Sequence, residues 1–151
     1  MAVVFFASCY CGAITLNSRG GAQSVIHCHC GQCRRLSGSA FTTWVSLAKS
    51  QVQVSGSEHL TMFKATSNVT RHFCKSCGSH VYTADGRLPH VLGVPAGIVK
   101  SALPLPKAHY FVGHKAVWQE INDALPQFGG ESGFEPNAAP PCAPADGFAV
   151  R

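Results

Sequence analysis

The chain has 151 residues, of which 46% are hydrophobic and only 13% are charged, so one domain of ordinary size can form a hydrophobic core without disulfide staples. The 15 glycines and 9 prolines, together with the low number of charges, favour β structure over helix. The formal net charge of +5 comes from scattered basic residues, with Arg34 and Arg35 as the one adjacent pair, and therefore predicts no nucleic-acid partner.

Apolar runs and alternating patterns predict a series of short strands separated by turn residues. The predicted strands cover residues 3–6, 13–16, 25–28, 41–45, 52–54, 60–64, 69–73, 80–83, 91–94 and 110–112. One helical turn is expected over 34–39, ended by Gly38, and one short helix over 116–125, ended by Pro126. These elements predict a mainly β fold with little helix. Four large apolar side chains are expected in the core, namely Phe41, Trp44, Met62 and Phe63.

The composition changes towards the end of the chain. From Gly129 onward the sequence is mostly Gly, Ala, Pro and Ser, and it offers little apolar surface to bury. We therefore predict one domain over 1–128 and a Gly/Ala/Pro-rich tail over 129–151. Cys142 lies in this tail and fits no ligand spacing.

The first residues give no sign of a targeting segment. Residues 1–7 carry no basic leader, and their apolar run is too short for a signal sequence. No run approaches the ~18 apolar residues of a membrane span. We therefore expect a cytoplasmic protein without a membrane partner. In that compartment, C-x-C and C-x-x-C spacings favour metal binding over disulfides.

Three thiols fall within one short stretch, at Cys28, Cys30 and Cys33. In an extended chain Cys28 and Cys30 point to the same side, and Gly31 allows the turn that returns Cys33 beside them. A catalytic zinc typically has three protein ligands and one open position. The spacing therefore predicts an open zinc site, and a distant His or Cys that closes the site is the alternative.

A second set of thiols combines two distant pairs. Cys9 and Cys11 form a C-x-C pair, and Cys74 and Cys77 form a C-x-x-C pair followed by Gly78, which supplies the unusual backbone angle of a hairpin tip. Four thiolates make a closed zinc site, which contributes folding free energy directly. We expect this site to join the first strands to the later hairpin.

Two other interpretations of the cysteines stay open. In one, the two C-x-C pairs form the closed site, which leaves over Cys33, Cys74 and Cys77. In the other, an iron–sulfur cluster replaces zinc, although the spacing lacks the usual ferredoxin runs. If seven thiolates bind two zinc ions, the formal net charge falls to about +2, which further weakens a nucleic-acid interpretation.

The histidines show no ligand spacing among themselves. His27 and His29 alternate with the cysteines and are expected to support or pack around the metal ligands rather than to bind metal. Each of the others is expected to be structural or exposed, and His80 is the first to test because it follows Cys77 closely.

The cysteine motifs belong to a longer series of residues that extends through much of the chain. It runs through Cys9-x-Cys11-Gly12, Cys28-His29-Cys30-x-x-Cys33-Arg34, Gly38, Phe41, Phe73-Cys74-x-x-Cys77-Gly78-Ser79, and then His109, Lys115, Trp118, Asp123, Leu125, Pro126 and Phe128. This order resembles the glutathione-dependent formaldehyde-activating enzyme family over roughly residues 5 to 128. One branch of that family resembles a centromere-associated protein, but this sequence lacks the basic extension that such a branch would need.

The resemblance implies small antiparallel sheets and two zinc ions per chain. It also implies a structural metal on Cys9, Cys11, Cys74 and Cys77 and a catalytic metal on Cys28, Cys30 and Cys33. The implied activity is that of a carbon–sulfur lyase, which forms or cleaves S-hydroxymethylglutathione from glutathione and an aldehyde. Arg34 and Arg35 are candidates to bind the carboxylates of glutathione. The alternative is a zinc-stabilised binding module without catalysis.

Overall fold

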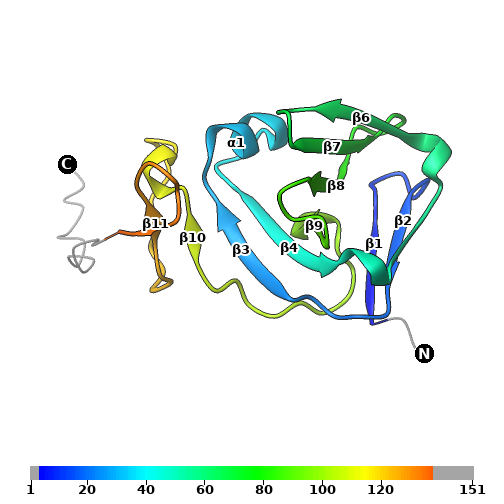
Figure 1. Cartoon of the computed structure of the whole chain (residues 1–151), viewed down its shortest axis with the longest axis horizontal. Helices are drawn as coiled ribbons and strands as arrows, with labels where there is room; N and C mark the ends of the chain where they lie inside the picture. The colour runs from blue at the N-terminus through cyan, green and yellow to red at the C-terminus, as the bar shows by residue number, and fades with distance from the viewer. Residues whose placement is uncertain (1–3, 138–151) are drawn as a thin grey trace, which may run out of the picture.

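Residues 4–137 are described by a computed structural model, in which strands predominate (Figure 1). The strands are β1 (Phe5–Ser8), β2 (Thr15–Ser18), β3 (Ser24–Cys28), β4 (Thr42–Ala48), β5 (Val52–Ser55), β6 (Leu60–Lys64), β7 (Val69–Cys74), β8 (His80–Asp85), β9 (Val91–Pro95), β10 (His109–Tyr110), β11 (Phe128–Gly129) and β12 (Glu135–Pro136). The helical elements are α1 (Gly31–Ser37) and the 3₁₀ turns η1 (Lys49–Gln51), η2 (Ser57–His59), η3 (Ala96–Ile98) and η4 (Val112–His114). The predicted mainly β fold is confirmed. Within 4–137, none of these helices offers the apolar length that crossing a bilayer requires.

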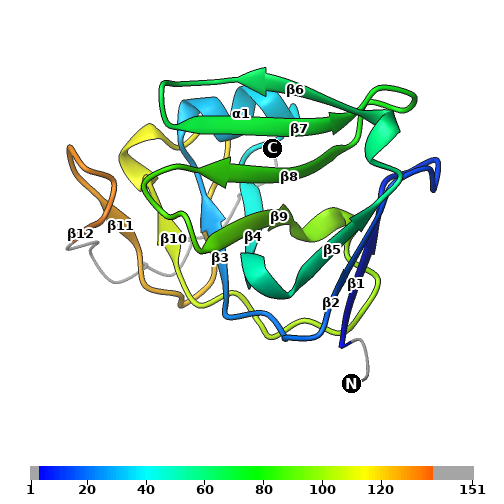
Figure 2. The same cartoon turned by 45° about the vertical axis from the view of Figure 1, so that its right-hand side comes forward.

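The strands form two principal sheets and one small pair. The larger sheet has seven strands in the order β10-β3-β4-β9-β8-β7-β6, and Figure 2 shows β6 to β9 stacked in succession. Its pairs are antiparallel except for β10 and β3, which run parallel. The smaller sheet is the antiparallel set β1-β2-β5, and β11 pairs with β12.

Strand alternation gives the seven-stranded sheet two different faces. Val45 and Leu47 of β4 are completely buried in one core cluster with residues of β1 and β2, while Trp44 and Ser46, which alternate with them, line a cavity on the opposite face. The largest completely buried apolar side chains are Phe5, Ile14, Leu16, Leu47, Val45, Val81 and Val94. Each such side chain contributes about 1.5–3 kcal/mol through burial, so this core supports the sheet from one side and leaves the other face for a site.

Helix α1 begins earlier in the chain than the sequence predicts. Cys30 is its N-cap, because the sulfur of Cys30 accepts a hydrogen bond from the backbone N–H of Cys33 over 3.2 Å. A thiol is not one of the usual capping groups, so the sequence gives a weak start signal. The predicted end is confirmed: Gly38 adopts a left-handed conformation with φ 66°.

Two predictions of local structure are wrong. The segment 116–125 is not helical: Val117 and Trp118 are mostly exposed, and the carboxylate of Asp123 instead accepts a hydrogen bond from His109. Met62 and Phe63 are 72% and 53% exposed rather than in the core, because β6 is the outer strand of the sheet. Phe41 and Trp44 are half-buried.

The residues that follow position 128 take part in the fold. Strands β11 and β12 pair with each other, and the Phe134 ring between them lies 5.3 Å from the Tyr110 ring and 5.2 Å from the Phe111 ring. The division into 1–128 and 129–151 stays a prediction. Cys142 lies outside the described residues.

Candidate functional site

Four thiols from two distant turns meet at one place. Cys9 and Cys11 lie between β1 and β2, Cys74 ends β7, and Cys77 lies in the turn before β8. Their sulfur atoms all lie within 4.8 Å of one another. Cys11 is 3.6 Å from Cys9 and 3.7 Å from Cys74, sulfur to sulfur. A tetrahedral zinc with Zn–S of about 2.3 Å needs sulfur atoms about 3.8 Å apart, so this cluster has the dimensions of such a site.

The two turns are shaped and joined by local contacts. Gly78 has φ 75°, a left-handed conformation that glycine adopts without strain, as the sequence predicts. The Ser79 hydroxyl accepts the backbone N–H of Tyr10 over 2.9 Å and so links the two turns. The same hydroxyl lies 3.2 Å from the Cys77 sulfur, and this hydrogen bond lowers the pKa of Cys77 to about 5. Thiolate is the form that binds metal.

The second cluster contains three thiols. Cys28 ends β3, Cys30 caps α1, and Cys33 lies in the first turn of α1. Their sulfur atoms also lie within 4.8 Å of one another, and no fourth His, Cys, Asp or Glu among residues 4–137 joins the group. His80 belongs to neither cluster and instead forms a hydrogen bond with the Thr83 hydroxyl. The grouping of thiols is therefore four plus three, and metal ligation by them stays a prediction.

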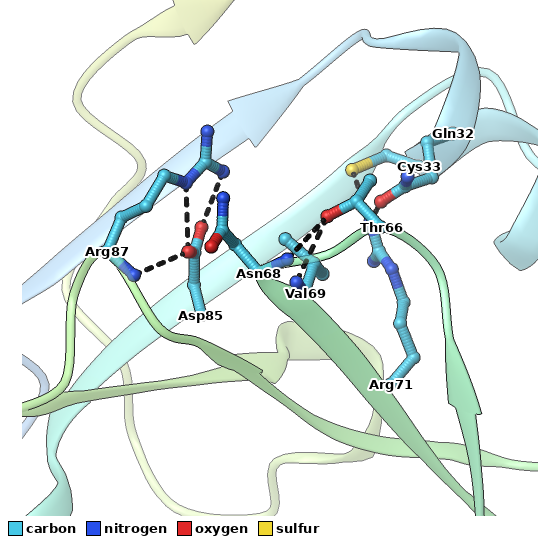
Figure 3. A network of polar contacts seen from close by, with 8 residues as sticks. All are labelled: Gln32, Cys33, Thr66, Asn68, Val69, Arg71, Asp85 and Arg87. Carbon is cyan, nitrogen blue, oxygen red and sulfur yellow. Dashed lines mark hydrogen bonds and ion pairs between the residues drawn. The ribbon is translucent and has the colours of Figure 1, made fainter.

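Polar donors converge on the Cys33 sulfur. The indole N–H of Trp44 donates to it over 3.4 Å, and a terminal nitrogen of Arg71 lies 3.6 Å away. Hydrogen bonds from Cys28 and Cys30, followed by those of Trp44 and the charge of Arg71, lower the pKa of Cys33 to about 2. Arg71 is only 4% exposed, and it also donates to the side-chain oxygen of Gln32 (Figure 3). A buried guanidinium needs a partner of opposite charge, and the Cys33 thiolate supplies it.

The three thiols line a cavity of about 570 Å³ on the free face of the seven-stranded sheet. Alternate positions of neighbouring strands form its floor, because the side chains of a strand alternate between the two faces. The floor includes Ile26, Trp44, Val69, Thr83 and Gly93. Gly93 lies against the Trp44 ring, where an added Cβ would come within 3.3 Å of a ring carbon. The cavity size is that of a small-molecule site.

The rim of the cavity comes from three loops. Arg87 forms an ion pair with Asp85 at 2.6 Å, and the two side chains point toward one another in Figure 3. This pairing lowers the pKa of Asp85. Leu88 follows in the same loop, and the aromatic side chains of Tyr110, Phe111 and Phe134 also line the cavity. Arg34 and Arg35 do not line this cavity.

A chain of hydrogen bonds lies behind the thiols. His109 Nε2 donates to Asp123, whose carboxylate oxygens lie 3.0 and 3.1 Å away, and His109 Nδ1 lies 2.8 Å from His29 Nε2. His29 is completely buried between Cys28 and Cys30, and burial lowers its pKa to about 4. The chain therefore anchors the cysteine segment to residues almost 100 positions later in the sequence.

The comparisons with known proteins agree with this geometry. A family model described as glutathione-dependent formaldehyde-activating enzyme matches residues 4–114. The chain belongs to the glutathione-dependent formaldehyde-activating enzyme family. The family match includes all seven cysteines of the two clusters. It ends before Asp123 and before the β11–β12 hairpin that carries Phe134.

Relatives of this glutathione-dependent formaldehyde-activating family occur in distant organisms. A Halomonas elongata protein, provisionally named a glutathione-dependent formaldehyde-activating enzyme, is 30% identical over 76% of this chain and 78% of its own length. An uncharacterized lyase of Schizosaccharomyces pombe is 31% identical over 56% of this chain and 62% of its own length. A crystal structure of a Rhodobacter sphaeroides protein is 24% identical, covers 66% of this chain and 91% of its own, and has a TM-score of 0.54. That likeness shows the fold alone.

Sequence reasoning finds the thiols and misses the groups that surround them. Trp44 is expected in the core, yet its N–H reaches the sulfur of Cys33 on helix α1. Arg71 carries no motif, although an arginine in the middle of a predicted strand is a signal of a buried partner. His29 is expected to support the metal ligands and lies in neither thiol cluster, but its partner His109, and Asp123 beyond it, come from remote segments.

Proposed function

We propose that this chain is a zinc-dependent carbon–sulfur lyase that forms or cleaves adducts of glutathione with an aldehyde, such as S-hydroxymethylglutathione. We further propose two zinc ions per chain and a cytoplasmic setting, in which the cysteines stay reduced. The observation that carries the proposal is the contrast between the two clusters. One has four thiols, while the other has three thiols that face a cavity.

The donor sets fit zinc in both places. The four-thiol cluster, Cys9, Cys11, Cys74 and Cys77, would hold a structural ion, and the tripod, Cys28, Cys30 and Cys33, would hold the second ion. Zinc held by three thiolates would supply a position for a soft fourth ligand, which suits the sulfur of a thiol substrate and favours its thiolate form. The family name and the name of the Halomonas elongata relative support glutathione as that thiol.

The chain's own residues prepare the tripod for this role. Three thiolates around a divalent ion leave a formal charge of about −1, and a further thiolate increases the negative charge. Arg71 lies 3.6 Å from the Cys33 sulfur and offsets part of that charge from a buried position. Trp44 holds the same sulfur from the cavity floor through its N–H. Both contacts fix the direction in which Cys33 faces the cavity.

The reaction itself is a reversible addition. The thiol sulfur adds to the carbonyl carbon, so a C–S bond forms while the C=O π pair moves to oxygen. That oxygen takes up a proton equivalent to the one the thiol lost, and the reverse steps regenerate glutathione and aldehyde. Since thiols add to formaldehyde unaided, the protein contributes chiefly by holding the two partners together in the cavity.

The test measures the ligands of the zinc and the rate at which the adduct forms and breaks down. Glutathione is titrated into the zinc-loaded protein while zinc-edge absorption is recorded, and exchange between glutathione, formaldehyde and adduct is followed by NMR. We expect a fourth sulfur at the tripod metal and faster exchange, both abolished by Cys33→Ser and both kept by Cys142→Ser. If neither change occurs in the wild type, or both persist in Cys33→Ser, the lyase proposal is wrong and the zinc-stabilised binding module replaces it.

A further inference from the structure

The cavity beside the tripod is larger than the hydroxymethyl group of a formaldehyde adduct requires. Formaldehyde adds a single carbon to the glutathione sulfur, so this group needs no pocket of its own. The space next to the three thiols measures about 570 Å³ and extends from Cys33 to the loops at the rim. Such a volume holds a drug-sized group, which is either part of the glutathione peptide or a larger substituent on its sulfur. The chemical character of the walls decides between the two.

The walls of this space are mainly apolar. The charged side chains that line it are Arg71, Asp85 and Arg87, and each already has a partner: Asp85 and Arg87 pair with each other, and Arg71 contacts Cys33 and Gln32. The carboxylates and ammonium of the glutathione peptide find few free charges here. A neighbouring hollow shares Gln32 with the cavity and is lined by Arg35. This arginine offers a positive charge next to the cavity for a carboxylate of the peptide.

Two large apolar side chains at the rim are unusually exposed. Phe134 is 61% exposed and Leu88 is 56% exposed, and both line the cavity from different loops. Phe134 is held by its ring contacts with Tyr110 and Phe111. Two exposed apolar side chains at the rim of one cavity favour an apolar group in contact with them, because burial removes all three surfaces from water.

The position of Phe134 in the chain adds a second argument. The family match ends at residue 114, and Phe134 comes from the β11–β12 hairpin beyond it. This hairpin is not part of what the family model describes, yet it completes one side of the cavity that contains the three thiols. A wall built from such a segment is suited to set substrate choice, since the reacting groups are elsewhere.

We infer that the cavity accepts the adduct of glutathione with an aldehyde whose substituent is an apolar group of several carbons, in contact with Phe134 and Leu88 at the rim. This inference rests on the proposed lyase function and names its substrate class. The bond changes are those of the formaldehyde reaction: the C–S bond forms, the carbonyl oxygen gains the proton, and no oxidant or reductant is needed. The substituent R of the aldehyde R–CHO takes no part in them and contributes binding only.

The first experiment measures binding with stable probes. S-hexylglutathione and S-methylglutathione are thioethers that carry a long and a short substituent, and their affinities for the zinc-loaded protein are compared by calorimetry. Each buried methylene favours binding by roughly fourfold, so even partial burial of the chain predicts S-hexylglutathione to bind at least about tenfold tighter. Equal affinities, or no binding of either probe, would overturn the inference.

Variants locate the binding to the rim. Phe134→Ala and Leu88→Ala are each expected to reduce the preference for the hexyl probe to about threefold, because each removes one of the two apolar contacts. Leu105→Ala is the matched control, since Leu105 is 87% exposed and lies outside the cavity. A preference that both rim variants keep in full would contradict the placement of the substituent against these two side chains. Because the two variants lie in different loops, a local folding defect in one of them would not explain the same result in the other.

The same preparations separate this inference from the proposed function. NMR exchange of S-hydroxymethylglutathione reports the lyase reaction, and the same measurement with hexanal in place of formaldehyde reports the substrate class. Exchange with formaldehyde, combined with no hexyl preference, leaves the lyase proposal intact and defeats the apolar site. A hexyl preference that depends on Phe134, without exchange for either aldehyde, supports the apolar site and defeats the lyase proposal.

Discussion

Replacing Cys77 by serine should destabilise the fold strongly, whereas replacing Cys33 should not. The four-thiol cluster connects Cys11 to Cys74, which are 63 positions apart in the chain. The chain-entropy estimate for a cross-link across that separation is about 4 kcal/mol. The tripod joins Cys28 to Cys33, and for so short a loop the same estimate gives about 2 kcal/mol. The free energy of unfolding of domains of this size is only about 5–15 kcal/mol. Loss of the four-thiol cross-link therefore removes a large part of it.

The assay is thermal unfolding followed by far-UV circular dichroism, with thiol titration of the native state. At roughly 3 °C per kcal/mol, Cys77→Ser should lower Tm by about 12 °C and expose thiols, while Cys33→Ser should lower it by about half as much. Cys142→Ser is the matched control for the loss of a thiol. Equal falls in Tm for Cys77→Ser and Cys33→Ser would refute the division into a structural and an open site.

Three further outcomes are expected. Elemental analysis should find about two zinc ions per chain, unchanged by Cys142→Ser. Arg71→Lys keeps the charge but loses the planar contacts of the guanidinium, so chelator competition should show weaker binding of one zinc by about tenfold. Burial raises the pKa of Asp123, but hydrogen bonds from Leu125 N–H and His109 lower it overall, so this carboxylate stabilises the fold above its unfolded pKa of about 3.9. Asp123→Asn should therefore reduce Tm near neutral pH, and the difference from the wild type should shrink as pH falls through the folded pKa.

Most of the features that could be predicted depend on residues that lie close together in the sequence. The C-x-C and C-x-x-C spacings are short enough that chain geometry alone brings their thiols together, and in the structure these thiols form two clusters. Gly38 and Gly78 both adopt the left-handed conformation that their positions suggest. The strand over 60–64 has the predicted bounds, because its apolar run is flanked by clear turn residues.

Long-range contacts explain what the sequence could not reveal. Arg71 lies 38 positions from Cys33, and nothing near either residue encodes that approach. Met62 looks like a core residue in a β-rich run, but its exposure depends on β6 having a neighbour on one side only. The segment 116–125 looks helical by composition, although it instead brings Asp123 to His109. In each case the outcome depends on where a remote strand lies.

Under the proposed function, the two clusters serve stability and chemistry in different parts of the chain. The four-thiol cluster ties the β1–β2 turn to the β7–β8 turn, so β7 and β8 are fixed beside β9 independently of the cavity. The cavity floor can then use Arg71 and Thr83 on those same strands as half of a binding surface rather than as core. Because the family match covers the clusters and stops before the β11–β12 hairpin, the hairpin can vary without disturbing the thiols. Substrate choice is therefore best sought in Phe134 and Leu88, and not in the cysteines.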